Sequence, residues 1–479
     1  DEVAKIVPKG FDYSVELEAG DIAIVTSQPE RFAADGLIGR IAKRVRRTIV
    51  LRPSEDIMVT PAEAKRSIED ILPESAGLKH VYFDACLREI TLICDDPGEA
   101  VGRRGAVLNE IRDATGWLVR VERTPPVLSK TIHDIRGYRE ANATERRKLL
   151  KNFGLNIHRP TRPGTAWARV TALGSYREVG RACHLVTTNE SRVMIDVGVN
   201  IASDTDPMPY FTAPEALPLD KLDAVVLTHA HLDHAGMLPV LFKYGYRGPV
   251  YCTPPTRDMM LLLQTDFLKV GGAEGKRAPY SMEDIRQCML HVVDVDWGKT
   301  TDITPDVKMT FENSGHILGS SAVHLNIADG KHNIVFSGDQ KYEKSWLFDA
   351  ANVRFPRCET LVIESTYGAS GDYQPSREEA TMELQDIVTR TIERGGKLVC
   401  PVFAVGRSQE VMIAIDDLFR AGNVKPVPVW LDGMIQEATA IHAAHPDYLT
   451  SSLRRSLLTD DGKNPFTSEW FRPVQGREL

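Results

Sequence analysis

The sequence predicts a multidomain protein of the α/β class. Its 479 residues are enough for three or more domains, and 42% hydrophobic with 26% charged residues is typical of a chain that buries several cores. Short apolar runs typical of strands alternate with helical stretches along the whole chain. Changes in pattern and motif divide the chain into residues 1–59, 60–126, 127–165, 166–364 and 365–479.

Composition and charge exclude several classes of protein. No apolar run approaches membrane-spanning length, and the first residues do not form a signal peptide. Seven cysteines are scattered without a C-x-x-C pair, which indicates a reducing compartment, the cytoplasm, and argues against a zinc ribbon. The net charge of -8 is not that of a nonspecific nucleic-acid binder, so any nucleic-acid surface must be a local patch.

The first two parts repeat one order of elements around a G-x-x-G turn, at Gly36 and Gly39 and again at Gly102 and Gly105. In the first part, two short strands within residues 12–26 and a helical stretch come before the turn, and a second helix and a strand follow it. The elements expected in the second part are, in order, a helix, two strands, a helix and a strand at residues 61–72, 80–84, 89–94, 106–115 and 117–122.

Both units resemble KH modules. In that family the G-x-x-G turn lets backbone amides at a helix start approach nucleic-acid phosphates. The resemblance therefore implies RNA contacts by Gly36, Gly39, Gly102, Arg103, Arg104 and Gly105. The second unit matches better, because its turn holds two arginines where the first holds Leu37 and Ile38.

A plain helix-turn-helix with a solvated basic edge is the alternative to a KH module. The basic run Lys43, Arg44, Arg46 and Arg47 fits either an RNA surface or a solvated face. Residues 127–165 are polar and strongly charged, and we expect a connector with one helix over 140–153 whose charges are solvated.

The fourth part holds the densest group of metal-type side chains. His229, His231, Asp233 and His234 follow an apolar run at residues 223–227 that is typical of a buried strand. The first two histidines are two residues apart, so in extended chain their imidazoles point the same way. Imidazole and carboxylate suit zinc, and a pair of zinc ions would clamp a phosphate ester during in-line displacement. Ordinary polar residues at a strand end are the alternative, although burying histidines unpaired is costly.

This H-x-H-x-D-H signature resembles the metallo-β-lactamase superfamily, whose fold is an αββα sandwich. Two later strand ends match further motifs of that family, at His316 and Asp339. The resemblance implies that His229, His231 and His316 hold one zinc, that Asp233 and His234 hold a second, and that Asp339 bridges the two. It also implies that Asp196, at the end of another strand, braces the histidine loop without binding metal.

Glu364 begins the sequence E-S-T-Y-G at the end of a strand, and this resembles the first motif of the β-CASP branch, which acts on nucleic acid. A capping-box pattern at Ser376 starts a helix, a strand is expected over 397–401, and Arg407 begins another helix, where it could contact phosphate or be an ordinary surface arginine. Two KH-like units before such a core resemble the archaeal homologues of the cleavage and polyadenylation specificity factor endonuclease.

That resemblance implies a zinc-dependent endoribonuclease with two zinc ions per subunit, which cuts single-stranded, often U-rich RNA in 3′-end formation and transcription termination. It also implies a homodimer, with RNA polymerase and elongation factors as partners. Whether the protein is also a 5′→3′ exonuclease is left open by the sequence. Asp233 and Glu364 are the expected catalytic residues. The alternative is a non-catalytic RNA-binding subunit, against which the complete set of ligands argues, because inactive paralogues usually lose some.

The chain departs from the family in its last part. Members carry two further histidines, a proposed general acid and a last zinc ligand, in contexts that neither His442 nor His445 matches. We therefore expect that both lie beyond Leu479 and that the β-CASP domain is incomplete.

Overall fold

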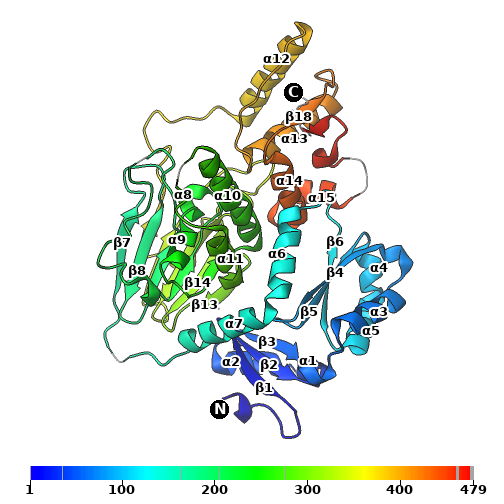
Figure 1. The fold of residues 1–479 in the computed structure, drawn as a ribbon, viewed down its shortest axis with the longest axis vertical. Coiled ribbons are helices and arrows are strands. Elements are labelled where there is room, and N and C mark those ends of the chain that lie inside the picture. The colour runs from blue at the N-terminus through cyan, green and yellow to red at the C-terminus, as the bar shows by residue number, and fades with distance from the viewer. Residues whose placement is uncertain are drawn as a thin grey trace.

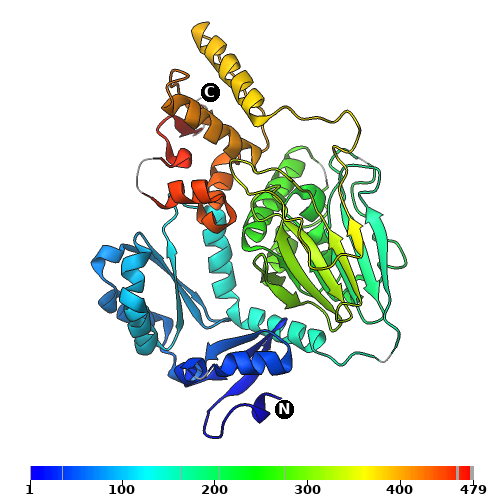
Figure 2. The same ribbon diagram turned by 180° about the vertical axis from the view of Figure 1, so that it is seen from behind.

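The computed structural model describes residues 2–34, 36–162, 164–203, 205–275, 277–459 and 463–474. Five hydrogen-bonded sheets and their helices form the parts shown in Figure 1, and the multidomain α/β class is confirmed. The two small N-terminal units and the C-terminal part lie on one side of a large double-sheet core, as the reverse view in Figure 2 also shows. In the described part of the chain, no helix combines the length and apolarity needed to cross a membrane.

The first unit is a three-stranded sheet in the order β1-β2-β3 with two helices. The first strand pair is antiparallel, and the last strand lies parallel to the middle one. Its core is made of Ile24, Phe32, Leu37 and Ile41, all fully buried. The elements are β1 (Ser14–Glu18), β2 (Asp21–Thr26), α1 (Pro29–Ala34), α2 (Leu37–Val45) and β3 (Ile49–Pro53).

The second unit repeats this topology, with sheet order β4-β5-β6, an antiparallel first pair and a parallel last strand. An extra helix, α3, starts it at a capping box in which Thr60 and Glu63 exchange side-chain to backbone hydrogen bonds. The elements are α3 (Pro61–Ile71), β4 (Leu78–Asp84), β5 (Glu89–Cys94), α4 (Pro97–Val101), α5 (Ala106–Thr115) and β6 (Leu118–Arg123).

The connector differs from its prediction. It forms two helices, α6 (Lys130–Ala141) and α7 (Ala143–Ile157), and not one. The break falls at Asn142, whose side-chain amide donates to the carbonyl of Tyr138 at 2.8 Å and so competes with helix continuation. The expectation of solvated charges is also wrong, because Arg139 binds Asp294 at 2.6 Å and the side chain of Arg146 is buried.

The core consists of two sheets packed face to face, of orders β12-β11-β10-β9-β8-β7 and β13-β14-β15-β16-β17. Buried residues of both sheets, such as Ile195, Tyr251, Phe311 and Phe336, form the layer between them. The first sheet contains β7 (Ala168–Gly174), β8 (Cys183–Thr188), β9 (Arg192–Ile195), β10 (Ala224–Val226), β11 (Val250–Cys252) and β12 (Val292–Asp294). The second contains β13 (Thr300–Asp302), β14 (Val307–Asn313), β15 (Ser321–Ile327), β16 (His332–Phe336) and β17 (Thr360–Val362).

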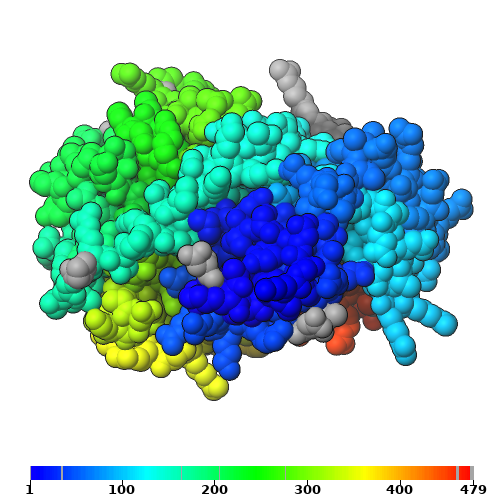
Figure 3. All heavy atoms as spheres, turned by 90° about the horizontal axis from the view of Figure 1, so that it is seen from below, coloured from blue at the N-terminus to red at the C-terminus, as the bar shows by residue number. Residues whose placement is uncertain are grey.

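A second apolar layer lies between the first sheet and its helices, α8 (Leu232–Ala235), α9 (Leu238–Lys243), α10 (Pro254–Ala273) and α11 (Met282–His291). The first N-terminal unit docks on this core through ion pairs of Asp21 with Lys299 at 3.1 Å and of Arg47 with Asp302 at 3.0 Å. Figure 3 shows it from below, as the dark blue atoms between the second unit and the core.

The C-terminal part contains α12 (Arg377–Glu393), α13 (Arg407–Arg420), β18 (Val429–Leu431), α14 (Ile435–Ala444), α15 (Ser451–Leu458) and β19 (Phe471–Pro473). The capping box of Ser376 and Glu379 starts α12 as predicted. The strand predicted over residues 397–401 is wrong, because that segment is irregular and exposed. Within the described residues its backbone has no neighbouring strand, and β18 pairs with β19 instead.

Candidate metal centre

The histidine loop begins where β10 ends, as predicted, and runs into the short helix α8. Its backbone is fixed by the loops beside it, because the carbonyls of Leu232, Asp233 and His234 accept hydrogen bonds from the N–H groups of Val199, Ala182 and Val197 at 2.6–2.9 Å. The backbone at position 198 lies so close to the histidine loop that only glycine fits there, since a Cβ would lie 1.6 Å from the carbonyl oxygen of Asp233. The loop is therefore held rigidly at the carboxyl end of the sheet.

All six side chains expected to bind metal come together there. One atom from each of His229, His231, His316 and Asp339 lies within 4.8 Å of the others, and His229, Asp233 and His234 form a second such group. Asp339 lies between the histidines, with its carboxylate oxygens 3.1 Å from His234 Nε2 and 3.4 Å from His316 Nε2. The loop after β10, the loop after β14 and the end of β16 thus converge on one point.

Asp196 fixes the position of this cluster through its contacts with Thr228 and His234. Its carboxylate accepts hydrogen bonds from the Thr228 N–H at 2.7 Å and the Thr228 hydroxyl at 2.8 Å, and it contacts His234 Nδ1 at 2.7 Å. Only 2% of Asp196 is exposed, and its φ of 59° is in the left-handed region, so the structure holds the residue in this position against local strain. Sequence analysis missed Thr228, which also lies 3.0 Å from His229 Nδ1.

The electrostatics of the cluster suit ligand chemistry. Burial lowers the pKa of His231 and of His316 to about 4 and that of His229 well below its usual value, so these imidazoles are neutral. Burial alone would raise the pKa of Asp339, but the imidazole of His234 holds it well below the usual range, so this side chain is a carboxylate. Neutral imidazole and ionised carboxylate are the forms that bind metal.

One buried atom points directly to a missing partner. The Nε2 atom of His229 is buried and has no hydrogen-bond partner among the described residues. An unpaired buried nitrogen costs free energy, which a bound cation would recover. Four imidazoles and two carboxylates from one pocket are the donor types that zinc prefers, so the residues present fit zinc.

Glu364 follows β17 and is tied to the loop of Asp339. Its carboxylate accepts hydrogen bonds from the backbone N–H of Gln340 at 2.9 Å and from the Thr366 hydroxyl at 2.6 Å. Its own N–H donates to the Ser337 hydroxyl at 3.1 Å. The glutamate therefore fixes the segment that carries Asp339 to the start of the C-terminal part.

The other histidines lie outside the cluster. His442 is fully buried with Nδ1 2.8 Å from the carbonyl of Ala438, and His445 pairs with Asp258 at 2.7 Å. His324 packs against Phe355, with ring centroids 5.8 Å apart. None of the three belongs to the two groups of metal-type ligands that the described residues form.

The two G-x-x-G turns differ in what they present. Arg103 and Arg104 are exposed between Gly102 and Gly105, and both glycines have a positive φ, of 72° and 80°. In the first turn, between Gly36 and Gly39, Leu37 is fully buried in the core of the unit. The structure therefore gives basic side chains to the second turn alone. Arg407 is exposed at the start of α13, where it pairs with Glu410 at 3.1 Å.

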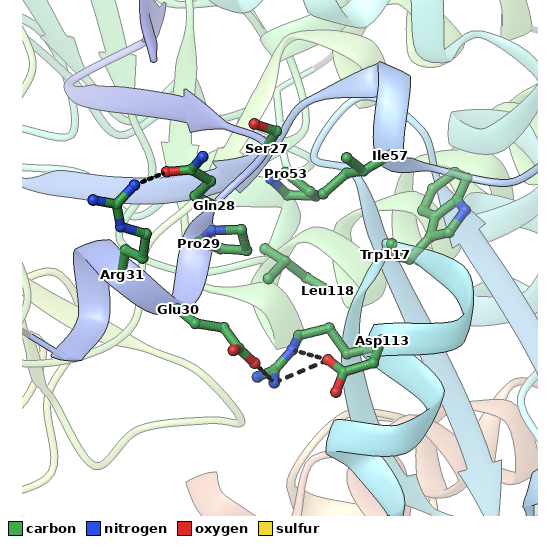
Figure 4. A pocket seen from close by; sticks show the side chains of 12 residues that line it. Ser27, Gln28, Pro29, Glu30, Arg31, Pro53, Ile57, Asp113, Trp117 and Leu118 are labelled. Carbon is green, nitrogen blue, oxygen red and sulfur yellow. Dashed lines mark hydrogen bonds and ion pairs between the residues drawn. The ribbon is translucent and has the colours of Figure 1, made fainter. Parts of the chain in front are cut away.

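A pocket of about 510 Å³ lies between the two N-terminal units, far along the chain from the metal-type residues. Figure 4 shows Pro29 and Pro53 of the first unit facing Trp117 and Leu118 of the second, with Glu30 paired to Arg112 at 2.6 Å across the mouth. No histidine or cysteine lines it, and it lies at the junction of the two units.

Comparison with known proteins agrees with this geometry. The model of the metallo-β-lactamase superfamily matches residues 176–392. The transcription termination factor FttA of Methanosarcina mazei is 48% identical over 479 residues, which cover 100% of this chain and 75% of that protein. The FttA of Methanothermobacter thermautotrophicus is 46% identical over 467 residues, which cover 97% of this chain and 73% of that protein.

Proposed function

The chain belongs to the family of archaeal transcription termination factors named FttA, which carries a metallo-β-lactamase domain, and from this we propose that it is a zinc-dependent endoribonuclease acting in transcription termination. The substrate that we assign is single-stranded RNA, with U-rich segments preferred. The observation that carries the proposal is the convergence of four imidazoles and two carboxylates from three separate segments on one point of the core.

In this proposal His229, His231 and His316 hold one zinc ion, Asp233 and His234 hold a second, and Asp339 lies between them. Bound zinc would supply a water acidic enough to be a nucleophile at neutral pH and would stabilise charge on the phosphoryl oxygens. Asp196 orients His234 through Nδ1, which leaves Nε2 free to face the site. Glu364 holds the backbone of Gln340 and so the position of Asp339.

The RNA-binding part of the proposal rests on the second N-terminal unit. Arg103 and Arg104 are exposed at a turn where two glycines allow close approach to the backbone, which is the arrangement of a KH module. A termination role makes RNA polymerase and its elongation factors the expected protein partners, and the family resemblance makes a homodimer the expected assembly. The first unit docks on the core through Asp21 and Arg47, and its turn at Gly36 and Gly39 would add a second, weaker contact with RNA.

A matched pair of histidine variants tests the proposal. His231→Ala removes a member of the cluster, whereas His324→Ala removes a histidine of the same core that lies outside it. We expect His231→Ala to bind less zinc and to lose cleavage of a labelled U-rich oligonucleotide, while its RNA affinity is retained. His324→Ala should keep both zinc and cleavage.

Two results would contradict this function. Unchanged zinc content and cleavage in His231→Ala would exclude the metallonuclease. Zinc and RNA binding by the unaltered full-length protein without any cleavage would instead favour a non-catalytic RNA-binding subunit.

A further inference from the structure

Three basic side chains gather beside the metal-type cluster, and they come from three different segments. Lys341 lies two residues after Asp339, Arg377 begins α12, and Arg407 begins α13. Lys341 lies within electrostatic reach of Glu410 and of both arginines, and His316 lies within reach of Lys341 and Arg407. The group therefore spans the junction between the core and the C-terminal part.

The backbone of Lys341 is fixed against the loop that carries His316. Its N–H donates to the carbonyl of Ser314 at 2.8 Å, and its own carbonyl accepts from the N–H of Ala351 at 2.9 Å. The contact is close enough to require glycine at position 315, where a Cβ would lie 2.7 Å from the Lys341 carbonyl oxygen. The start of this side chain is thus positioned as firmly as the cluster itself.

The ammonium group of Lys341 has no ion pair or hydrogen bond within the ranges that the structure describes, although the residue is half-buried. Its neighbour in sequence, Lys344, pairs with Asp349 at 2.9 Å. The carboxylates within electrostatic reach are Glu410, which already pairs with Arg407 at 3.1 Å, and Glu343, and neither forms an ion pair with Lys341. A half-buried cation in this position, beside two further cations, favours an added anion.

The two arginines are held in place by other contacts. The guanidinium of Arg377 lies 5.2 Å from the centroid of the Trp346 ring and donates to the carbonyl of Lys344. Arg407 follows Gly406, which lies close to Ile317, the residue next to His316. A Cβ added at Gly406 would be 3.3 Å from the Ile317 side chain. Arg407 itself pairs with Glu410 at 3.1 Å and lies within electrostatic reach of His316, whereas Arg377 is fixed on the segment that follows Lys341.

We propose that Lys341, Arg377 and Arg407 form an anion site that binds a phosphodiester of the RNA next to the one positioned at the metal cluster. The proposal rests on the nuclease function above and names the residues that hold its substrate. Arginine forks match phosphate oxygens and lysine adds a point charge, so phosphate is the fitting anion. A strand bound here would contact the core and the C-terminal part at once, and would hold the two together.

The test compares Lys341→Gln and Arg407→Gln with Lys331→Gln, a change of an exposed lysine in the turn between β15 and β16. Steady-state cleavage of a single-stranded oligonucleotide should show a KM raised by about 10-fold in the first two, the loss of one charge-assisted hydrogen bond, with kcat and zinc content little changed. Lys331→Gln should match the unaltered protein.

A second arm keeps the anion site testable if cleavage fails altogether. In a His231→Ala background, which should bind RNA without cutting it, Lys341→Gln should weaken RNA affinity and reduce the slope of log affinity against log salt by about 0.7, the value for one phosphate on a single strand. Absence of cleavage in the unaltered full-length protein would refute the nuclease, whereas an unchanged affinity and slope in Lys341→Gln would refute the anion site.

The source of the phosphate is distinguished by the RNA end. If Lys341→Gln loses equal RNA affinity with 5′-hydroxyl and with 5′-phosphate oligonucleotides, the site binds an internal phosphodiester, as proposed. A loss confined to the 5′-phosphate oligonucleotide would overturn that assignment in favour of a terminal phosphate.

Discussion

Asp196→Asn is the most informative change near the cluster, because it keeps the shape of the side chain and removes its charge. The carboxylate accepts two hydrogen bonds from Thr228 and contacts His234 Nδ1, and an amide of the same size has one oxygen to accept and an NH2 group that must face a donor. At least one buried partner of Asp196 is then left without an acceptor.

The magnitude follows from these contacts. Losing a hydrogen bond to a buried charged group costs roughly 1.5–3 kcal/mol, so the free energy of unfolding should fall by about 2–3 kcal/mol. Groups that orient a ligating histidine typically contribute 10–100-fold to metal affinity, and we expect a loss of about that size for zinc. The position of His234 should change more than that of His229, because Asp196 contacts His234 directly.

Urea unfolding and zinc competition against a chromogenic chelator measure the two effects. Asp223→Asn is the matched control, since Asp223 accepts from the Arg192 N–H at 2.9 Å and pairs with Arg159 at 3.0 Å at the opposite end of β10. The control should lower stability and leave zinc affinity unchanged. If Asp196→Asn binds zinc as well as the unaltered protein does, or if the control weakens zinc equally, the bracing role is wrong.

Three further outcomes are expected. Burial alone would lower the pKa of His234, but its carboxylate neighbours raise this pKa well above the usual value. Zinc binding at pH 7 should therefore release about one proton. Calorimetry should show this release as a binding heat that depends on the buffer, and the dependence should be lost in His234→Ala. Burial lowers the pKa of His442 to about 4, so the stability that this neutral side chain contributes is complete above pH 6.5 and should fall by about 2 kcal/mol as the pH drops to 5. In urea unfolding, the stability of His442→Gln should depend less on pH than that of the unaltered protein. Replacing Arg103 and Arg104 together by glutamine should reduce the salt slope of RNA binding by about 1.4, measured by filter binding, with cleavage of a short oligonucleotide unchanged.

The positions of the metal-type residues could be predicted because their signals are local. His229 and His231 follow an apolar run with the spacing of extended chain, and a strand end is where a sheet presents polar side chains. His316 and Asp339, by contrast, carry no such signal of their own, and they are expected as ligands only because their motifs resemble those of the metallo-β-lactamase superfamily once the first motif is present. The structure places these residues together, although 87 residues separate His229 from His316 in the chain.

Lys341 and the segment 397–401 show where local signals fail. Nothing in the sequence around Lys341 indicates that its ammonium forms no ion pair, because that depends on which residues pack nearby. Leu398 and Val399 favour a strand by composition, but a strand also needs a neighbour to pair with its backbone, and the described residues provide none there.

The connector explains how the RNA-binding unit and the metal cluster keep a fixed relation. Helix α6 is capped at its start by Glu437 of α14, with the Ser129 hydroxyl donating to that carboxylate at 2.6 Å. About two turns further Arg136 binds Glu122 of the second unit at 2.6 Å, and at the end of the helix Arg139 binds Asp294 of the core. One helix therefore joins three parts of the molecule through charges whose partners are remote in sequence. A charged run of this kind resembles a solvated linker until its partners are known, so its role in joining the second unit to the core can be inferred only from the folded chain.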